Sequence, residues 1–465
     1  MCYQHPLFPG RLRIFCIASC LFCMACKKLL TIPPPEKNLR SQEIFSDNQH
    51  AEAAATGLYH QMAGNDQWIT NGGATLYAGL SADELYNYFS NESLDEFFTN
   101  SLNAGNNYGI AVNLWQAGYK NIYHANAVLE GLDASKGLSE AIKKRLRGEM
   151  LLARALHYFY LVNFFGDIPL ITTTNYRVNE QLPRAPVTDV YGQLLNDLEE
   201  ALTLLPETFP ATGRSKPNKY AAAALLARTH LYLGNWTNAG HYAGVVIDVG
   251  PFALANEPAK VFGAVSEETI WQLPGSGTTY HTSEGYFFIP YDTLTIPEFG
   301  VTTFLLDAFE PGDLRRAQWL GMNKASGVAL YYPYKYKTRN SMRTPEQYIL
   351  LRLAEQYLVR AEAYAMQHRL VESLDDLNRI RHRAGLPRVV NVSQDSLLTA
   401  IRQERRVELF AEWGHRWLDL KRTKQADTIL GRQKAPGWQP TDVLYPIPAG
   451  QILLNPTFTQ NPGYD

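Results

Sequence analysis

The sequence predicts a mainly α-helical protein built from paired helices, with a loop-rich irregular segment inserted among them. Three segments share a pattern in which an Arg precedes a Tyr by four residues among small and apolar side chains, which places both on one helix face. The second segment is followed by a Gly-Asn break and another helical segment, as in a helix hairpin. The three pairs are Arg154 and Tyr158, Arg228 and Tyr232, and Arg360 and Tyr364.

The clearest helix pair is expected over residues 219–249, with an Ala/Leu-rich helix over 219–233 and a partner over 236–249 that ends at Gly250. The same plan predicts a later pair over residues 347–367 and 370–384. Pairs of small-residue helices with a repeat of about 34 residues are the plan of a tetratricopeptide hairpin. We therefore expect a tetratricopeptide-like helical hairpin scaffold.

Residues 251–344 are expected to form a loop-rich aromatic insertion, because Gly, Pro and Thr interrupt every helical run there. Residues 64–107 form a second stretch expected to be irregular. Loops held by a rigid scaffold often carry recognition, so both stretches are candidate binding regions. Four prolines near the end forbid continuous helix and predict an extended tail: Pro446, Pro448, Pro456 and Pro462.

The first 25 residues are expected to be a lipoprotein signal peptide. Arg11 and Arg13 precede an apolar run over residues 14–25, which is shorter than the roughly 20 residues of a membrane-spanning helix. Cys26 follows the run directly, so we expect cleavage before it and acylation of its side chain. Residues 26–40 would then form the lipidated N-terminus and a stiff, proline-rich spacer.

Two alternatives to lipidation at Cys26 stay open. Ala25 suits the position before an acylated cysteine, but Cys23 and Met24 fit the two preceding positions poorly. The segment ending at Cys20 is a closer local match behind too short an apolar run, and a plain secretory signal is the other alternative. No cysteine follows Cys26, so the body is expected to lack disulfides, thiolate metal sites and a cysteine nucleophile.

Charge and motifs argue against nucleic-acid binding and catalysis. The net charge is −2, so there is no basic field to gather phosphates. The G-x-S-x-G, H-E-x-x-H and phosphate-loop patterns are missing, so we expect no enzyme activity, no cofactor and no metal site. The charged run over residues 402–408 predicts a salt-bridged helix face. Three pairs of adjacent carboxylates are candidates for a glycosidase dyad, namely Asp83–Glu84, Asp95–Glu96 and Glu267–Glu268. Side chains of adjacent residues point in different directions, so we do not expect any of these pairs to act together in catalysis.

Short motifs recur along nearly the whole chain. The C-terminal ones are LRLAEQYLVRAEAY (351–364), LNRIR (377–381), IRQERRVEL (401–409), RWLDLKR (416–422), YPIP (445–448) and QNPGY (460–464). The earlier ones are YKNIYHAN (119–126), FGDIPL (165–170) and LGNW (233–236). Together, and in this order, they resemble the SusD/RagB family of outer-membrane nutrient-binding lipoproteins.

This resemblance implies a scaffold with four tetratricopeptide-like helix pairs that packs against a TonB-dependent, SusC-like transporter. It implies a non-enzymatic protein, lipid-anchored at the outer membrane and exposed at the cell surface, that captures an oligosaccharide or, in some members, a peptide. It divides the body into an N-terminal SusD-like helical region (41–250), the insertion (251–344) and a C-terminal SusD/RagB helical region with the tail (345–465). Five motif residues are expected to be structural: Arg360, Glu362, Arg405, Glu408 and Trp417.

The predicted ligand site combines aromatic rings, which suit the C–H face of a sugar, with polar groups that suit its edge. Both irregular stretches contribute to it. The candidates are Trp68, Tyr86, Asn87 and Tyr88 from the first stretch, and Tyr280, Tyr286 and Tyr291 from the second. Three alternatives stay open, namely a peptide ligand in the same groove, a glycoside hydrolase, and a pure scaffold whose only partner is the transporter.

Overall fold

The computed structural model describes residues 43–263, 266–273, 281–340 and 346–464. Cys26, where a lipid is predicted, and Tyr280, a predicted ligand residue, lie outside the described residues. A search of the described helices for one apolar and long enough to span a bilayer finds none.

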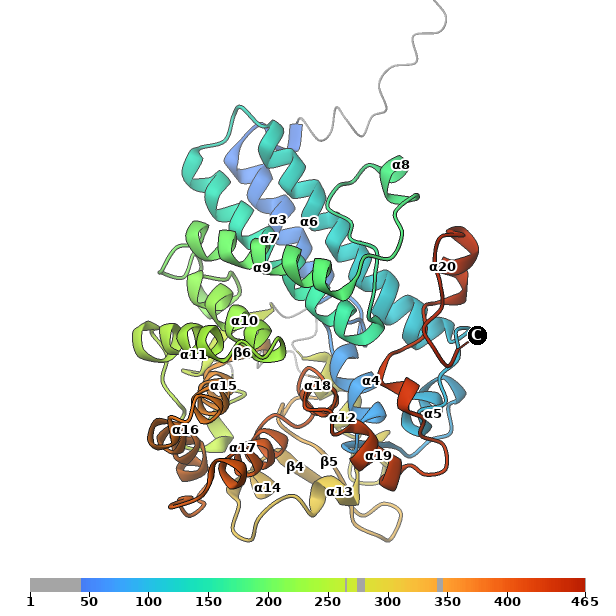
Figure 1. Ribbon diagram of the computed structural model, residues 1–465, viewed down its shortest axis with the longest axis vertical. Helices are drawn as coiled ribbons and strands as arrows, with labels where there is room; N and C mark the ends of the chain where they lie inside the picture. The colour runs from blue at the N-terminus through green and yellow to red at the C-terminus, as the bar shows by residue number, and fades with distance from the viewer. Residues whose placement is uncertain (1–42, 264–265, 274–280, 341–345, 465) are drawn as a thin grey trace, which may run out of the picture.

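The scaffold is a row of long helices in which each helix packs against the next along the chain (Figure 1). This arrangement confirms the predicted mainly α-helical fold of stacked helix pairs. The long α7 shows why the row is stable, because it is buried on all sides over its C-terminal two thirds, between α6 and α9. The row consists of α3 (Asn48–Met62), α6 (Ala117–Ala134), α7 (Glu140–Phe165), α9 (Val187–Leu204), α10 (Lys219–Tyr232), α11 (Trp236–Gly244), α15 (Leu353–Met366), α16 (Leu370–Arg383) and α17 (Gln394–Glu408).

The predicted helix pair over residues 219–249 is confirmed as α10 and α11. Gly234 has φ +69°, the left-handed conformation that reverses the chain between them. The last turn before Gly250 is a π-helix, η4 (Val245–Val249). Arg228 on α10 is buried and donates from Nε to Glu355 Oε1 of α15 at 2.6 Å, so an ion pair fixes this hairpin against the next one.

Three local predictions are wrong. Residues 348–352, expected to begin a helix, form strand β6 (Tyr348–Arg352), in which every side chain is buried. The short apolar run before Arg352 does not distinguish a buried strand from a buried helix. Residues 64–107 are less irregular than expected and contain α4 (Gly73–Ser81) and α5 (Glu92–Thr99). The tail is not wholly extended, since α20 (Ala449–Leu454) fits between two prolines.

Short strands and helices fill the space beside the row and carry the loops. The described strands pair antiparallel as β1 (Leu85–Asn87) with β3 (Phe299–Val301), β2 (Thr269–Leu273) with β6, and β4 (Leu320–Asn323) with β5 (Leu330–Pro333). The remaining helices are η2 (Asn107–Gln116), α8 (Tyr176–Asn179), η3 (Thr212–Arg214), η5 (Pro258–Lys260), α12 (Ser283–Phe288), α13 (Thr303–Leu306), α14 (Leu314–Trp319), α18 (His415–Arg422), α19 (Ala426–Gln433) and η6 (Pro440–Val443).

Candidate functional site

Strand β1 presents an aromatic surface next to the scaffold. Its burial alternates, because successive side chains of a strand point to opposite faces. Leu85 is buried on one face, while Tyr86 points outward and is 40% exposed. The rings of Tyr86 and Tyr88 lie 5.0 Å apart between centroids, and Phe98 of α5 lies 5.1 Å from Tyr86. We call these three residues the tyrosine platform.

A glycine on the partner strand holds the platform in place. Gly300 of β3 pairs with Tyr86 in the strand register, and the ring of Tyr88 lies directly against its Cα. A Cβ at Gly300 would approach Tyr88 Cε2 to 2.4 Å, closer than real carbon atoms come. The backbone N–H of Tyr88 donates to the carbonyl of Glu298 at 3.0 Å. The platform therefore depends on residues more than 200 positions apart in the chain.

Asn87 faces the other way from the platform tyrosines. It is buried, its Nδ2 donates to Asp95 Oδ1 at 3.1 Å, and its Oδ1 accepts from the N–H of Phe89 at 3.2 Å. Its amide is thus occupied in shaping the loop between β1 and α5. The structure gives Asn87 a positioning role behind the platform, whereas sequence reasoning placed it among the ligand contacts.

A second group of side chains surrounds Tyr286 on α12. Its ring is 40% exposed and lies between the imidazole of His281, 5.1 Å away between centroids, and the guanidinium of Arg339, 4.7 Å from the ring centroid. Arg339 is held by the carbonyls of Tyr286 and Ile289. Burial raises the pKa of Glu298, and the nearby Arg339 opposes that shift.

Tyr291 and Trp68 make no ring contact with these groups among the described contacts, although Gln67, next to Trp68, donates its N–H to Ser283 of α12 at 3.2 Å. Tyr291 is 80% exposed on a loop that Asn323 holds by donating to the carbonyl of Thr295 at 3.0 Å. Trp68 is half-buried, with the ammonium of Lys120 from α6 4.9 Å from its ring centroid. Of the predicted ligand residues, the structure therefore brings Tyr86 and Tyr88 together, and Tyr286 belongs to a group of its own with His281 and Arg339. It places Trp68 toward α6.

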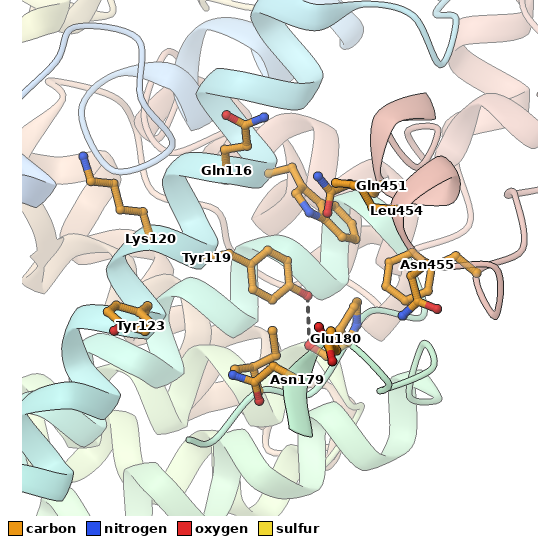
Figure 2. A pocket seen from close by; sticks show the side chains of 13 residues that line it. Gln116, Tyr119, Lys120, Tyr123, Asn179, Glu180, Gln451, Leu454 and Asn455 are labelled. Carbon is orange, nitrogen blue, oxygen red and sulfur yellow. Dashed lines mark hydrogen bonds between the residues drawn. The ribbon is translucent and has the colours of Figure 1, made fainter. Parts of the chain in front are cut away.

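A pocket of about 600 Å³ opens between the start of α6, the segment around α8 and the tail helix α20 (Figure 2). Sequence reasoning missed this pocket. Its lining is Trp115, Gln116, Tyr119, Lys120, Tyr123, Pro169, Ile171, Asn179, Glu180, Gln451, Leu454, Asn455 and Phe458. The sequence pattern that could have indicated the pocket is the pair Tyr119 and Tyr123, which lie four residues apart on one helix face.

In each carboxylate pair considered for catalysis, at least one member is engaged in structural contacts. Asp83 is buried and accepts from Arg416 Nε at 2.6 Å and from Arg406 Nη2 at 2.7 Å. Asp95 accepts from Asn87, and Glu268 is buried against Arg383. Among the described residues, no cluster of His, Cys, Asp or Glu is arranged to hold a metal ion.

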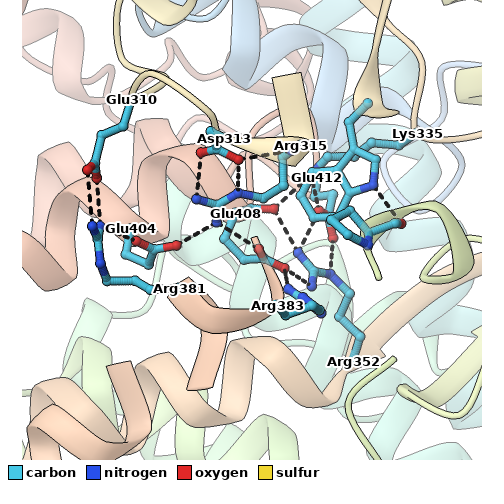
Figure 3. A network of polar contacts seen from close by, with 12 residues as sticks. Glu310, Asp313, Arg315, Lys335, Arg352, Arg381, Arg383, Glu404, Glu408 and Glu412 are labelled. Atoms are coloured by element: carbon cyan, nitrogen blue, oxygen red, sulfur yellow. Dashed lines mark hydrogen bonds and ion pairs between the residues drawn. The ribbon is translucent and has the colours of Figure 1, made fainter. Parts of the chain in front are cut away.

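The charged run on α17 forms part of a buried ion-pair network (Figure 3). Glu404 and Glu408 both accept from Arg315 of α14, at 2.6 and 3.0 Å. Glu408 also accepts from Arg352 of β6 at 2.6 Å and from Arg383 of α16. The predicted salt bridges on this helix face are confirmed, and the face is buried rather than solvated. The other charged motif residues also form ion pairs, which are Arg360 with Asp376, Glu362 with Arg422, and Arg405 with Asp419.

Comparison with known proteins identifies the family. Residues 35–232 match a family model described as starch-binding, associating with the outer membrane, and residues 313–464 match the SusD family model. The chain is 25% identical to SusD-like protein P2 of Formosa agariphila, over 92% of this chain and 94% of that protein.

Solved structures agree with this match. A SusD superfamily protein from Bacteroides vulgatus superposes with a TM-score of 0.79 at 20% identity, covering 90% of this chain and all of that one. A laminarin-binding SusD-like protein superposes with a TM-score of 0.76 at 25% identity, covering 90% of this chain and 99% of that one. Two family models that together span most of the chain, and the same fold over nine tenths of its length, show that the chain belongs to the SusD/RagB family.

Proposed function

We propose that this protein binds oligosaccharide on the tyrosine platform at the cell surface and delivers it to a TonB-dependent, SusC-like transporter. The observation that carries the ligand class is a pair of adjoining tyrosine rings, the exposed Tyr86 and the half-buried Tyr88, of which Tyr88 packs against Gly300. Relatives named as binding starch or laminarin support a glycan over other ligands.

The geometry suits a sugar ring. Tyr86 offers a ring face to the C–H side of a pyranose, and its hydroxyl is free to exchange hydrogen bonds with the ring's edge. Each such stacking contact contributes about 0.5–1.5 kcal/mol beyond the area it buries. The affinity for a short glycan is therefore modest, and longer glycans gain by touching Tyr86 and the Tyr286 group together.

Affinity electrophoresis and calorimetry test the ligand class. Starch, laminarin, xylan and mannan serve as glycan probes, and peptides from digested casein as the alternative. The platform predicts binding to at least one glycan and a loss of about tenfold in the double variant Tyr86→Ala/Tyr88→Ala. The matched control is Tyr176→Ala, because Tyr176 on α8 is 66% exposed and lies outside the platform.

Three outcomes would contradict this proposal. Binding of casein peptides without any glycan would identify a peptide-capturing protein. Release of reducing ends from a polysaccharide would identify a glycoside hydrolase. Equal glycan affinity in the double variant and the Tyr176→Ala control would remove the platform as the site.

The anchor and the partner are part of the same proposal. An apolar run that ends at Cys26, and a family described as associating with the outer membrane, support a lipid at this cysteine. Affinity purification of the full chain from outer membranes is expected to recover a TonB-dependent transporter. Recovery of the chain alone from mildly solubilised membranes would contradict delivery through such a partner.

A further inference from the structure

We propose that the pocket between α6 and α20 is a second carbohydrate-binding site, separate from the tyrosine platform. The class of ligand, a neutral oligosaccharide, rests on the proposed function. The position of the second site rests on the residues that line the pocket. The pocket volume of about 600 Å³ lies within the range of about 300–1,000 Å³ that is usual for ligand sites.

The floor of the pocket is a set of fixed aromatic rings (Figure 2). Tyr119 donates its hydroxyl to the carbonyl of Pro169 at 2.9 Å, so its ring is held in one orientation. The ring of Trp115 lies 5.0 Å from that of Tyr119 and packs edge-on against Phe165 at 5.0 Å. Tyr123, one turn further along α6, is 50% exposed at the rim. Rings that are already ordered bind a sugar face without losing further side-chain freedom.

Polar groups without a protein partner surround these rings. Among the described contacts, no hydrogen bond or ion pair engages the side chains of Gln116, Glu180 or Gln451, which lie on three different walls. The side chains of Asn179 and Asn455 are already engaged, because their amides donate to the carbonyls of Thr173 and Leu182. The uncommitted groups supply both donors and acceptors, as the hydroxyl groups of a sugar require.

This pattern selects a sugar over an apolar protein segment. An apolar side chain seated on Tyr119 would cover Gln116, Glu180 and Gln451 and leave their polar atoms buried without partners, which is unfavourable. Sugar hydroxyls would pair with them. The charges at the pocket are Glu180 and Lys120, which have opposite sign, so no excess of positive charge favours an acidic sugar or a phosphate.

The two sites are made of different elements and can be removed independently. The platform consists of β1, β3 and α5, whereas the pocket consists of α6, the α8 segment and α20. The pocket variant is Tyr123→Ala/Gln451→Ala, since both side chains are at least partly exposed and their loss does not open the core. Tyr176→Ala is the matched control, because Tyr176 is an exposed tyrosine on α8 that does not line the pocket.

Calorimetry on the full chain in mild detergent tests the inference with maltotriose, laminaritriose, xylotriose and mannotriose. For at least one of them we expect two independent sites. The double variant Tyr86→Ala/Tyr88→Ala weakens one site by about tenfold, and Tyr123→Ala/Gln451→Ala weakens the other by about tenfold. Crystals soaked in the same trisaccharide are expected to show a sugar over Tyr119.

The outcomes separate this inference from the proposed function. A single site that Tyr86→Ala/Tyr88→Ala weakens, with the pocket variant equal to the wild type, overturns the second site and leaves the platform intact. A wild type that binds none of the four trisaccharides and none of the polysaccharides overturns both. Loss of the second binding site in Tyr176→Ala, but not in Tyr123→Ala/Gln451→Ala, also overturns the placement of that site in the pocket.

Discussion

Replacing Glu408 by Gln tests whether the buried ion-pair network holds the insertion to the C-terminal helices. Glu408 is fully buried, and its carboxylate accepts from Arg352 Nη1 at 2.6 Å, from Arg315 Nη1 at 3.0 Å and from Arg383. Burial alone would raise the pKa of Glu408, but the three arginines together lower it well below its ordinary value. The carboxylate therefore stays charged, and its removal leaves the three guanidinium groups sharing one carboxylate fewer. Each keeps another partner, namely Asp313 and Glu404 for Arg315, Glu412 for Arg352 and Glu268 for Arg383, so one positive charge in the network loses its compensation.

The expected loss follows from that geometry. Removing one partner of a buried ion pair costs about 3–5 kcal/mol, because the remaining charge is uncompensated. Folded domains are stable by only about 5–15 kcal/mol, so Glu408→Gln should remove roughly a fifth or more of the free energy of unfolding. Glu372→Gln is the matched control, since Glu372 pairs with Arg369 at 3.0 Å on an exposed helix surface and should cost less than about 1 kcal/mol.

Urea unfolding followed by tryptophan fluorescence measures both variants under the same conditions. The double variant Glu408→Gln/Arg383→Met should recover part of the loss, because it removes one of the stranded charges. A loss of less than about 1 kcal/mol in Glu408→Gln, equal to that in Glu372→Gln, would refute the reasoning.

Three further perturbations test other parts of the structure. Gly300→Ala should displace the ring of Tyr88 and weaken binding of the glycan retained in the affinity gels by several-fold, measured by calorimetry. Cys26→Ala should abolish metabolic labelling with palmitate, whereas Cys20→Ala should keep it. Burial raises the pKa of Glu284 to about 8, so between about pH 4.5 and 8 the folded protein binds a proton that the unfolded chain releases. The free energy of unfolding of the wild type therefore falls as pH rises through this range, and Glu284→Gln should flatten that dependence.

Each of these has its own control and contrary result. Gly192→Ala on α9 meets nothing within 4 Å, so it should leave glycan binding unchanged; equal binding in Gly300→Ala would contradict the packing of Tyr88. Labelling that survives Cys26→Ala but not Cys20→Ala would move the lipid to the earlier cysteine. Urea midpoints of Glu284→Gln that change with pH as steeply as those of the wild type would show that this carboxyl does not titrate between the two states.

The scaffold was predictable where local chemistry decides the structure. Gly234 has to adopt the left-handed conformation between α10 and α11, and the small side chains before it allow close helix packing, so the hairpin follows from neighbouring residues. Residues 348–352 were not predictable in this way. Their apolar run becomes strand β6 because β2, far away in the sequence, pairs with it.

The candidate site was also predictable only in part. The alternation of Tyr86 and Tyr88 was open to sequence reasoning, but their support by Gly300 was not, because strand pairing between distant segments leaves no local pattern. The pocket was missed for a related reason. Tyr119 on α6 looks like an ordinary packing residue until α20, from the far end of the chain, supplies the opposite wall with Gln451.

The ion-pair network also limits how relatives can exchange parts. Arg315 belongs to the aromatic insertion, whereas its partners Glu404 and Glu408 belong to a helix about 90 positions later. An insertion transplanted from a relative would need an arginine at the equivalent place, or it would take one arginine partner away from each of two buried carboxylates. Grafts that alter glycan preference should therefore keep α14 and replace only the loop around Tyr291, which is 80% exposed.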